Sequence, residues 1–251
     1  GAAARPHHGP APMKGLVLAI QFLTHLPMPK VTANETDFAR SIRWFPAVGA
    51  IVGLSVMFAV NLGVRIDPWI GALAGLLCWV GVTGALHLDG LGDIADSCGA
   101  VHKGRDRLLA VLADPHVGSF GVVAIGLQLI VKLLLLHALV ERGMMLPLLL
   151  IPFAARIGPL LWARMLPPLH AGLGARFADA VKTIHIALWI SLLIIAAWWL
   201  PALLAAPLLM LVWGLWLKRR LGGISGDGHG AGIELVESGL LFVVLIAGGT
   251  T

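Results

Sequence analysis

The sequence predicts an all-α integral membrane protein, a polytopic bundle of about seven transmembrane helices with an interfacial helix at the N-terminus. Of its 251 residues, 58% are hydrophobic and only 12% are charged, whereas soluble domains carry about a quarter charged residues. Apolar stretches follow one another along the chain, and the short segments between them alternate in basic content, as is typical of membrane topology. We therefore expect the chain to cross a lipid bilayer several times.

The apolar stretches approach the length of a membrane span. A helix rises about 1.5 Å per residue, so about 20 apolar residues cross a hydrocarbon core roughly 30 Å thick. The stretches are Phe45–Gly63, Trp69–Leu86, Phe120–Ala138, Met144–Trp162, Ile184–Leu200, Leu203–Leu217 and Ile233–Gly248. The last two are short, so instead of crossing fully, either could be tilted, re-entrant or partly buried in protein.

The N-terminal region differs from these spans. Leu16–Leu26 is apolar but too short to cross, which indicates a helix lying in the membrane interface. Residues 1–12 are small and proline-rich and lack the apolar centre of a signal peptide, so we interpret them as a tag or a disordered tail. A single transmembrane domain is expected over residues 13–251.

The distribution of basic residues predicts the orientation of the bundle. With seven crossings, the loops on one side carry only Arg65 and Arg142. The loops on the other side carry Lys30, Arg40, Arg43, Lys103, Arg105, Arg107, Arg164, Arg176, Lys182, Lys218, Arg219 and Arg220. Because cytoplasmic loops collect Lys and Arg, this second side is expected to face the cytoplasm, with the N-terminus inside and the C-terminus outside.

Composition also argues against two other classes of protein. Cys78 and Cys98 lack the spacing of a zinc site, and two cysteines make no disulfide framework. The net charge of +5 could attract nucleic acid, but the basic residues are scattered over short loops rather than gathered in a patch. We expect no nucleic-acid partner.

A first acidic cluster follows the second apolar stretch. Asp89, Asp93 and Asp96 stand at i, i+4 and i+7, which places their side chains within about 60° of one helix face. Unpaired carboxylates so close would repel, and such hard oxygen ligands favour Mg²⁺ over zinc. Gly90 beside the first acid would let a ligand approach the backbone. In the simpler alternative, the acids end a solvated helix and pair with the basic residues that follow, which are Lys103, Arg105 and Arg107.

A second candidate segment is rich in glycine. Gly222–Gly232 contains six glycines and Asp227, and we expect it to form a loop with exposed amides. Such a backbone can bind phosphate oxygens through its N–H groups, with Gly223 and Gly226 as candidates. Asp227 could then complete the metal site begun by the first cluster. A flexible linker is the simpler alternative for the glycines.

Glu234 and Glu237 enter the last apolar stretch. Carboxylates inside a membrane span usually face the bundle interior or a polar cavity, where they act as ligands, as pairing partners or as proton acceptors. Either residue could therefore contribute to substrate binding.

Three further polar residues have two interpretations each. Asp114 precedes the third stretch, where it could be another ligand or a helix N-cap. Arg156 lies inside the fourth stretch and should pair with a buried acid or with a substrate phosphate, because an isolated guanidinium there would be costly. His87 points away from the aspartate face, which favours a packed or hydrogen-bonded role over a ligand role.

Several motifs together resemble one known family. The segment His87–Asp96 is similar to the signature of cobalamin synthases, the adenosylcobinamide-GDP ribazoletransferases. Other family motifs are matched, in order, by Gln21–Pro27, Phe45–Gly49, Asp114–Gly121, Gly172–Gly174, Gly222–Asp227 and Glu234–Glu237. The resemblance covers nearly everything from Met13 onward. The aspartate motif is also distantly similar to that of CDP-alcohol phosphotransferases, although their Ala-Arg pair and full spacing are absent.

This resemblance implies a Mg²⁺-dependent enzyme of the bacterial inner membrane. It implies that adenosylcobinamide-GDP is joined to α-ribazole or α-ribazole 5′-phosphate, with release of GMP. Polarising a phosphoanhydride and neutralising its leaving group would use carboxylate-held metal, a glycine-rich backbone and basic side chains. We expect Asp89 and Asp93 to bind metal, and Asp96 and Asp227 to act as further ligands or as the general base.

One different class of function stays open. A polytopic ion-coupled transporter or membrane scaffold would use Glu234 and Glu237 as intramembrane acids instead. The aspartate cluster at the membrane edge favours the enzyme, and GMP release by the purified protein would discriminate the two. The sequence leaves open whether the protein forms a homo-oligomer, how many metal ions it binds and which ribazole form it prefers.

Overall fold

A computed structural model describes residues 11–100, 105–112, 114, 116–169 and 173–248. These residues form helices and contain no β-strand, which confirms the predicted all-α class. The elements of the first half are α1 (Ala11–Leu23), α2 (Glu35–Ser41), η1 (Ile42–Trp44), α3 (Phe45–Gly63), α4 (Pro68–Thr83), α5 (Leu86–Ala100) and α6 (Arg105–Leu112). Those of the second half are α7 (Ser119–Glu141), α8 (Leu146–Ala155), α9 (Gly158–Met165), α10 (Leu173–Ala180), α11 (Thr183–Ala197), η3 (Pro201–Ala205), α12 (Ala206–Arg220) and α13 (Gly226–Ala247).

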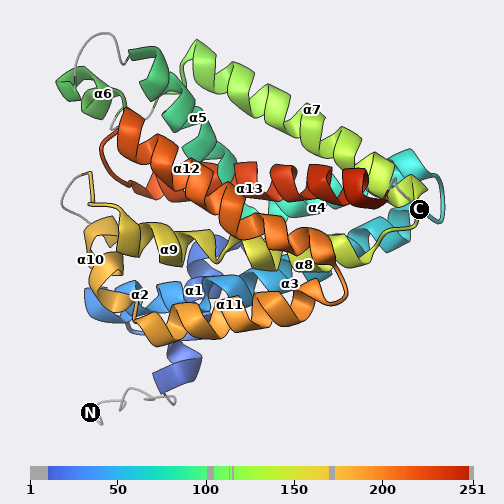
Figure 1. Cartoon of the computed structure of the whole chain (residues 1–251), viewed down its shortest axis with the longest axis horizontal. Coiled ribbons are helices and arrows are strands. Elements are labelled where there is room, and N and C mark those ends of the chain that lie inside the picture. The colour runs from blue at the N-terminus through green and yellow to red at the C-terminus, as the bar shows by residue number, and fades with distance from the viewer. Residues whose placement is uncertain (1–10, 101–104, 113, 115, 170–172, 249–251) are drawn as a thin grey trace, which may run out of the picture.

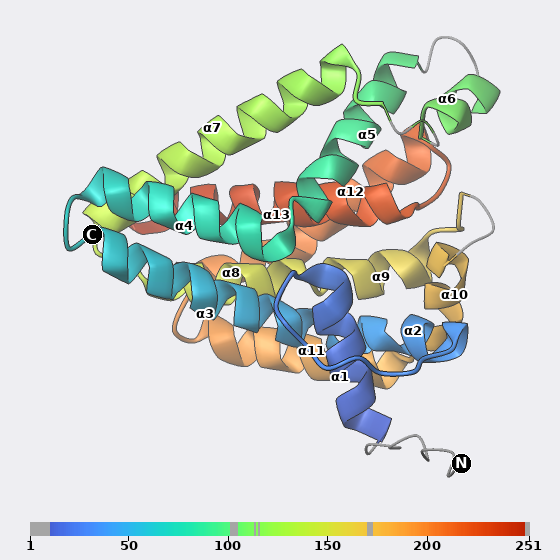
Figure 2. The same cartoon turned by 180° about the vertical axis from the view of Figure 1, so that it is seen from behind.

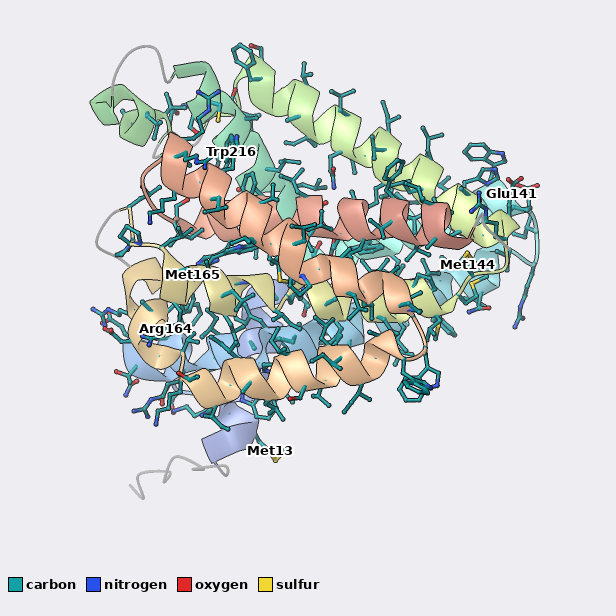
Figure 3. The ribbon with its side chains drawn as sticks, in the orientation of Figure 1. Met13, Glu141, Met144, Arg164, Met165 and Trp216 are labelled. Atoms are coloured by element: carbon teal, nitrogen blue, oxygen red, sulfur yellow. The ribbon has the colours of Figure 1, made fainter. Side chains whose placement is uncertain are left out.

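The long helices run roughly along one axis, so the bundle has two ends (Figures 1 and 2). At one end lie α2, α6, α10, the C-terminal end of α12 and the start of α13. At the other end lie the connections α3–α4 and α7–α8, together with the C-terminus. Figure 3 marks the two ends with Arg164 at the first and with Glu141 and Met144 at the second. The helices at the first end carry Arg40, Arg105, Arg176 and Arg220, so we call it the basic end.

Fewer helices reach the length of a span than the sequence predicted. Among the described residues, five helices are long and apolar enough to cross a membrane, or up to six if the bent pair α4–α5 is one span. The predicted span Ile184–Leu200 is realised as α11, which has only 15 helical residues. At about 1.5 Å per residue it reaches roughly 22 Å, short of a 30 Å hydrocarbon core. The short stretch Leu203–Leu217 instead belongs to a 20-residue helical segment, Pro201–Arg220.

A sharp bend separates α4 from the aspartate segment. Gly84 ends α4 in the left-handed conformation with φ +60°, and Ala85 follows with φ +58°. Glycine takes this conformation without steric cost, which makes it a frequent helix terminator. As a result, α5 leaves the direction of α4 by 83°, whereas the sequence suggested that the aspartates simply close the second span.

The glycine-rich segment is mostly helical rather than a loop. Helix α13 begins at Gly226, and Ser225 caps it by accepting a hydrogen bond from the backbone N–H of Gly228 at 3.1 Å. Only the residues before Ser225 form a turn. The prediction of a loop through Gly232 was wrong because these glycines let neighbouring helices approach closely, which offsets their poor intrinsic helix propensity.

Candidate active site

Helices α5 and α13 pack so closely that two distant acidic segments meet at the basic end. A Cβ atom on Gly90 would lie 2.8 Å from the backbone oxygen of Asp227 and 2.9 Å from its Cα. Only glycine fits at such a distance, so the first turn of α13 lies directly against α5. Asp227 thereby joins the aspartates of α5 in one cluster, as the sequence suggested.

The cluster concentrates negative charge. The carboxylate of Asp93 interacts electrostatically with those of Asp227, Asp89 and Asp96. Asp89 is exposed and Asp93 is half-buried, and within the described part of the chain neither carboxylate forms an ion pair or a hydrogen bond. Like charges so close repel unless a cation lies among them. The alternative pairing with Lys103, Arg105 and Arg107 concerns side chains outside the described residues.

Asp96 differs from Asp89 and Asp93 because its carboxylate accepts hydrogen bonds from the backbone. Its carboxylate accepts hydrogen bonds from the backbone N–H groups of Gly118 at 2.7 Å and Gly121 at 2.9 Å. These groups belong to the N-terminus of α7, so Asp96 caps that helix from a distance of more than twenty residues in sequence. Asp96 therefore ties α5 to α7, and its role as a metal ligand stays a prediction.

Asp114 does not take the predicted place at the N-terminus of α7. It is exposed, and its Oδ1 accepts a hydrogen bond from the backbone N–H of His116 at 3.0 Å. The N-cap residue of α7 is Gly118, and the capping carboxylate is that of Asp96. The capping role proposed for Asp114 was wrong, and its role as a ligand stays a prediction.

The two glycines proposed to bind phosphate have different surroundings. A Cβ atom on Gly223 would lie 2.3 Å from the backbone oxygen of Pro167, so this glycine packs against the connection after α9. Gly226 is exposed, and a Cβ atom there would have nothing within 4 Å. At the first turn of α13, only Gly226 therefore offers open space to a ligand.

The acidic cluster offers oxygen ligands that suit Mg²⁺, although the described residues do not form a complete set of ligands around one point. Among the described residues, no three His, Cys, Asp or Glu side chains are grouped tightly enough to hold a metal ion alone. Mg²⁺ commonly takes only one or two carboxylates and completes its shell with water and substrate phosphate. Asp89, Asp93 and Asp227 supply suitable oxygen ligands, so the donor set is compatible with the ion.

The intramembrane acids lie elsewhere, in a buried network of charges. Lys132 of α7 donates hydrogen bonds to Glu234 at 2.7 Å and to Glu237 at 2.8 Å. Arg156 donates to the other oxygen of Glu237, also at 2.8 Å. These four side chains are at most 4% exposed, and their formal charges cancel. Glu234 therefore pairs with Lys132, and Glu237 pairs with both Lys132 and Arg156, so these acids act as pairing partners inside the bundle.

Polar and aromatic neighbours complete this network. Gln128 donates to Glu234 Oε2 at 2.9 Å and to Ser238 Oγ at 2.8 Å. The ammonium of Lys132 lies 4.4 Å from the centre of the Trp79 ring, an attractive cation–π arrangement. His87 is buried, with Nδ1 3.5 Å from Arg156 Nη2, which confirms a packed role for it.

Lys132 and Gln128 are the residues that the sequence interpretation missed. They stand four residues apart in an otherwise apolar stretch, which puts both on one face of α7. A lysine and a glutamine at that spacing inside a span indicate acidic or hydrogen-bonding side chains in another span. That signal could have linked them to Glu234 and Glu237.

Comparison with known proteins gives a consistent family assignment. Residues 15–245 match the family model of cobalamin-5-phosphate synthase. The chain is 60% identical over 240 residues to an adenosylcobinamide-GDP ribazoletransferase of Novosphingobium aromaticivorans, covering 94% of this chain and 98% of the relative. A protein of the same name from Laribacter hongkongensis is 50% identical over 94% of this chain and 98% of its own length. Another, from Thiobacillus denitrificans, is 46% identical over 92% and 94%.

No solved structure matches this chain. The arrangement of the acidic cluster is therefore argued from the contacts of this chain alone.

Proposed function

The chain belongs to the cobalamin-5-phosphate synthase family, and we propose that its acidic cluster at the basic end is the catalytic centre of an adenosylcobinamide-GDP ribazoletransferase. Family membership gives the reaction: adenosylcobinamide-GDP is joined to α-ribazole or its 5′-phosphate, and GMP is released. The observation that carries the assignment of the centre is the contact between Gly90 and the backbone of Asp227, which unites the two acidic segments.

The reaction is a phosphoryl-group transfer. A hydroxyl oxygen of the ribazole attacks the phosphorus on the cobinamide side of the diphosphate and forms a new P–O bond. The phosphoanhydride P–O bond breaks, and its electron pair leaves with GMP. The hydroxyl proton must pass to a nearby base, and the negative charge that grows on the leaving phosphate must be stabilised.

We assign the role of proton acceptor to Asp227. It is half-buried on the first turn of α13, and it lies against Gly90 and within electrostatic range of Asp93. A carboxylate in this position can accept the proton of the attacking hydroxyl. The carboxylate of Asp96 already accepts two backbone N–H groups, and this favours a positioning role for it.

Asp89 and Asp93 would hold Mg²⁺, with Asp227 near it. When bound, the ion would withdraw charge from the diphosphate and offset the charge of the GMP that leaves. The open N-terminal turn of α13 adds a second source of positive potential, because helix N–H groups and the helix dipole favour anions there. Gly226 is exposed at this turn and leaves room for a phosphate oxygen.

We place this centre on the cytoplasmic side of the bacterial inner membrane. The basic connections gather at the same end of the bundle as α5 and the start of α13 (Figure 1), and cytoplasmic loops are those enriched in Lys and Arg. A nucleotide-linked substrate would then reach the cluster from the compartment that contains nucleotides. Labelling of single cysteines from either side of the membrane tests this orientation.

The proposal is tested by measuring GMP release from adenosylcobinamide-GDP and α-ribazole with the purified protein. We expect release to require Mg²⁺ and to stop when the metal is chelated. Asp93→Asn keeps the shape of the side chain but removes the charge, so release should fall at least about a hundredfold with an unchanged melting temperature.

The matched control is Asp67→Asn. Asp67 caps α4 at the opposite end of the bundle, where asparagine is an equally good N-cap. This variant should retain normal turnover. Near-normal GMP release by Asp93→Asn at limiting Mg²⁺ would show that the cluster is not the catalytic centre.

A further inference from the structure

A second polar site lies at the basic end, apart from the acidic cluster. A cavity of about 440 Å³ opens between α1, α2, α10 and the start of α11. It is lined by charged side chains, namely Lys14, Asp37, Arg40, Arg43, Asp179 and Lys182. In Figure 2, the helices that form it lie on the opposite side of the bundle from α5 and α6.

The cavity has an excess of positive charge. Four of its lining side chains are cations and two are carboxylates, which leaves a formal charge of +2 when histidine is neutral. Lys14 and Asp37 pair with each other at 2.6 Å, so one cation and one anion are already matched. The remaining cations outnumber Asp179 by three to one. Such a cavity favours an anionic ligand.

Unused hydrogen-bond donors lie at and beside this cavity. The Nε atom of Arg43, which lines the cavity, is buried and has no hydrogen-bond partner in the described structure, and the same is true of Nε1 of the adjacent Trp44. A buried donor without a partner costs free energy, which an acceptor from a ligand would recover. The guanidinium of Arg43 also approaches Gly15 of α1, with Nη2 3.6 Å from the position that a Cβ atom would take.

An apolar groove continues directly from the polar cavity. It holds about 230 Å³ and is lined by Trp44, Leu188 and Trp189, and it shares Arg43 and His185 with the cavity. The backbone oxygen of Arg43 accepts a hydrogen bond from Trp189 Nε1 at 2.8 Å, which fixes α11 to η1. Leu188 is 54% exposed on an apolar helix, so the groove opens onto a surface suited to lipid.

We propose that this composite site binds one anionic glycerophospholipid, with its phosphate in the cationic cavity and one acyl chain in the groove. The joined polar and apolar compartments match a molecule that has a charged head and a hydrocarbon chain. A free phosphate or nucleotide would fill the cavity but would leave the groove empty. The helix α1, predicted to lie in the interface, closes one wall and places the site at headgroup depth.

The test uses phosphatidylglycerol and phosphatidylcholine with identical acyl chains, titrated into the purified full chain in detergent and counted by native mass spectrometry. We expect one phosphatidylglycerol to bind at least about tenfold more tightly than phosphatidylcholine, because charge-assisted hydrogen bonds to phosphate are strong. Arg43→Gln should remove most of this preference. Arg40→Gln changes an exposed cation of the same cavity and should weaken it too, even if the Arg43 variant fails to fold.

The control is Arg219→Gln, which removes an exposed cation from the basic end outside this cavity. It should leave the affinity for phosphatidylglycerol unchanged. Equal binding of the two lipids, or equal weakening by the Arg40 and Arg219 variants, would overturn the proposal in favour of diffuse attraction. Displacement of the lipid by millimolar inorganic phosphate would overturn it in favour of a soluble anion site.

Discussion

The two acidic groups of α13 differ in how their charge is balanced. Asp227 at the N-terminal turn belongs to a cluster in which carboxylates face other carboxylates. Two turns later, Glu234 and Glu237 are fully enclosed and matched by Lys132 and Arg156. Acids that pair with buried cations hold helices together, whereas several acids gathered at an open surface are suited to a cation and an anionic substrate. One helix thus carries both kinds.

The largest effect is expected from breaking the balanced group. Glu237→Gln leaves Lys132 and Arg156 with one carboxylate between them, and an uncompensated buried charge costs about 3–5 kcal/mol. The free energy of unfolding, measured by denaturing-detergent titration in mixed micelles, should fall by that amount. Glu141→Gln, at the mostly exposed end of α7, should change it by no more than about 0.5 kcal/mol. Equal effects of the two variants would contradict a structural role for the network.

The next effect should separate catalysis from stability on the same helix. Asp227→Asn should lower kcat for GMP release by about a hundred- to a thousandfold, because the amide cannot accept the proton. Its free energy of unfolding should stay near that of the parent, since asparagine keeps the shape of the side chain and Asp227 is only half-buried. A variant that lost stability and kept kcat would place Asp227 with the structural acids instead.

A smaller effect tests the contact that joins the two acidic segments. Gly90→Ala would put a Cβ atom 2.8 Å from the backbone oxygen of Asp227, and such overpacking costs about 1–3 kcal/mol. Because α13 must shift away from α5, kcat should fall as well. Gly126→Ala is the matched control, since a Cβ atom there meets nothing within 4 Å and alanine favours a helix. Unchanged kcat in Gly90→Ala would mean that the contact does not position Asp227.

The smallest effect concerns Asp96. It lies near the acidic cluster, but its carboxylate is held by two backbone N–H groups. Asp96→Ala removes the cap of α7 and should cost about 0.5–2 kcal/mol of unfolding free energy. Asp96→Asn keeps an oxygen that can accept one N–H group, so it should lose less stability and stay within about tenfold of normal kcat. If Asp96→Asn abolished GMP release at unchanged stability, Asp96 would be a ligand or a base, as the sequence first suggested.

Much of the fold and part of the site could be predicted from the sequence because they depend on local patterns. Apolar stretches of span length predict helices, and aspartates at i, i+4 and i+7 indicate one helix face; α5 contains all three. The resemblance of His87–Asp96 to cobalamin synthases is confirmed by the family match. Each of these signals lies within about twenty consecutive residues.

Features that depend on distant contacts could not be predicted in the same way. Glycine at the start of α13 indicates a loop by propensity alone, and only the close approach of α5 shows why a helix is tolerated there. Likewise, the partners of Lys132 lie more than 100 residues away in sequence. The cap of α7 comes from Asp96 rather than from Asp114, and Asp96 belongs to α5, which turns by 83° from the direction of α4.

Helix α13 is synthesised after α7 and α8, the helices that supply its buried cations, and this order has a consequence for membrane insertion. Glu234 follows Lys132 by 102 residues, so at about 5–20 residues per second a ribosome takes roughly 5–20 s to supply the first countercharge. During this interval, helices α7 and α8 reach the membrane with a lysine and an arginine that have no acidic partner. Insertion of α13 neutralises both cations and delivers Asp227 in the same event. A nascent chain that stops before this helix would therefore lack Asp227 and would leave Lys132 and Arg156 without the carboxylates of Glu234 and Glu237.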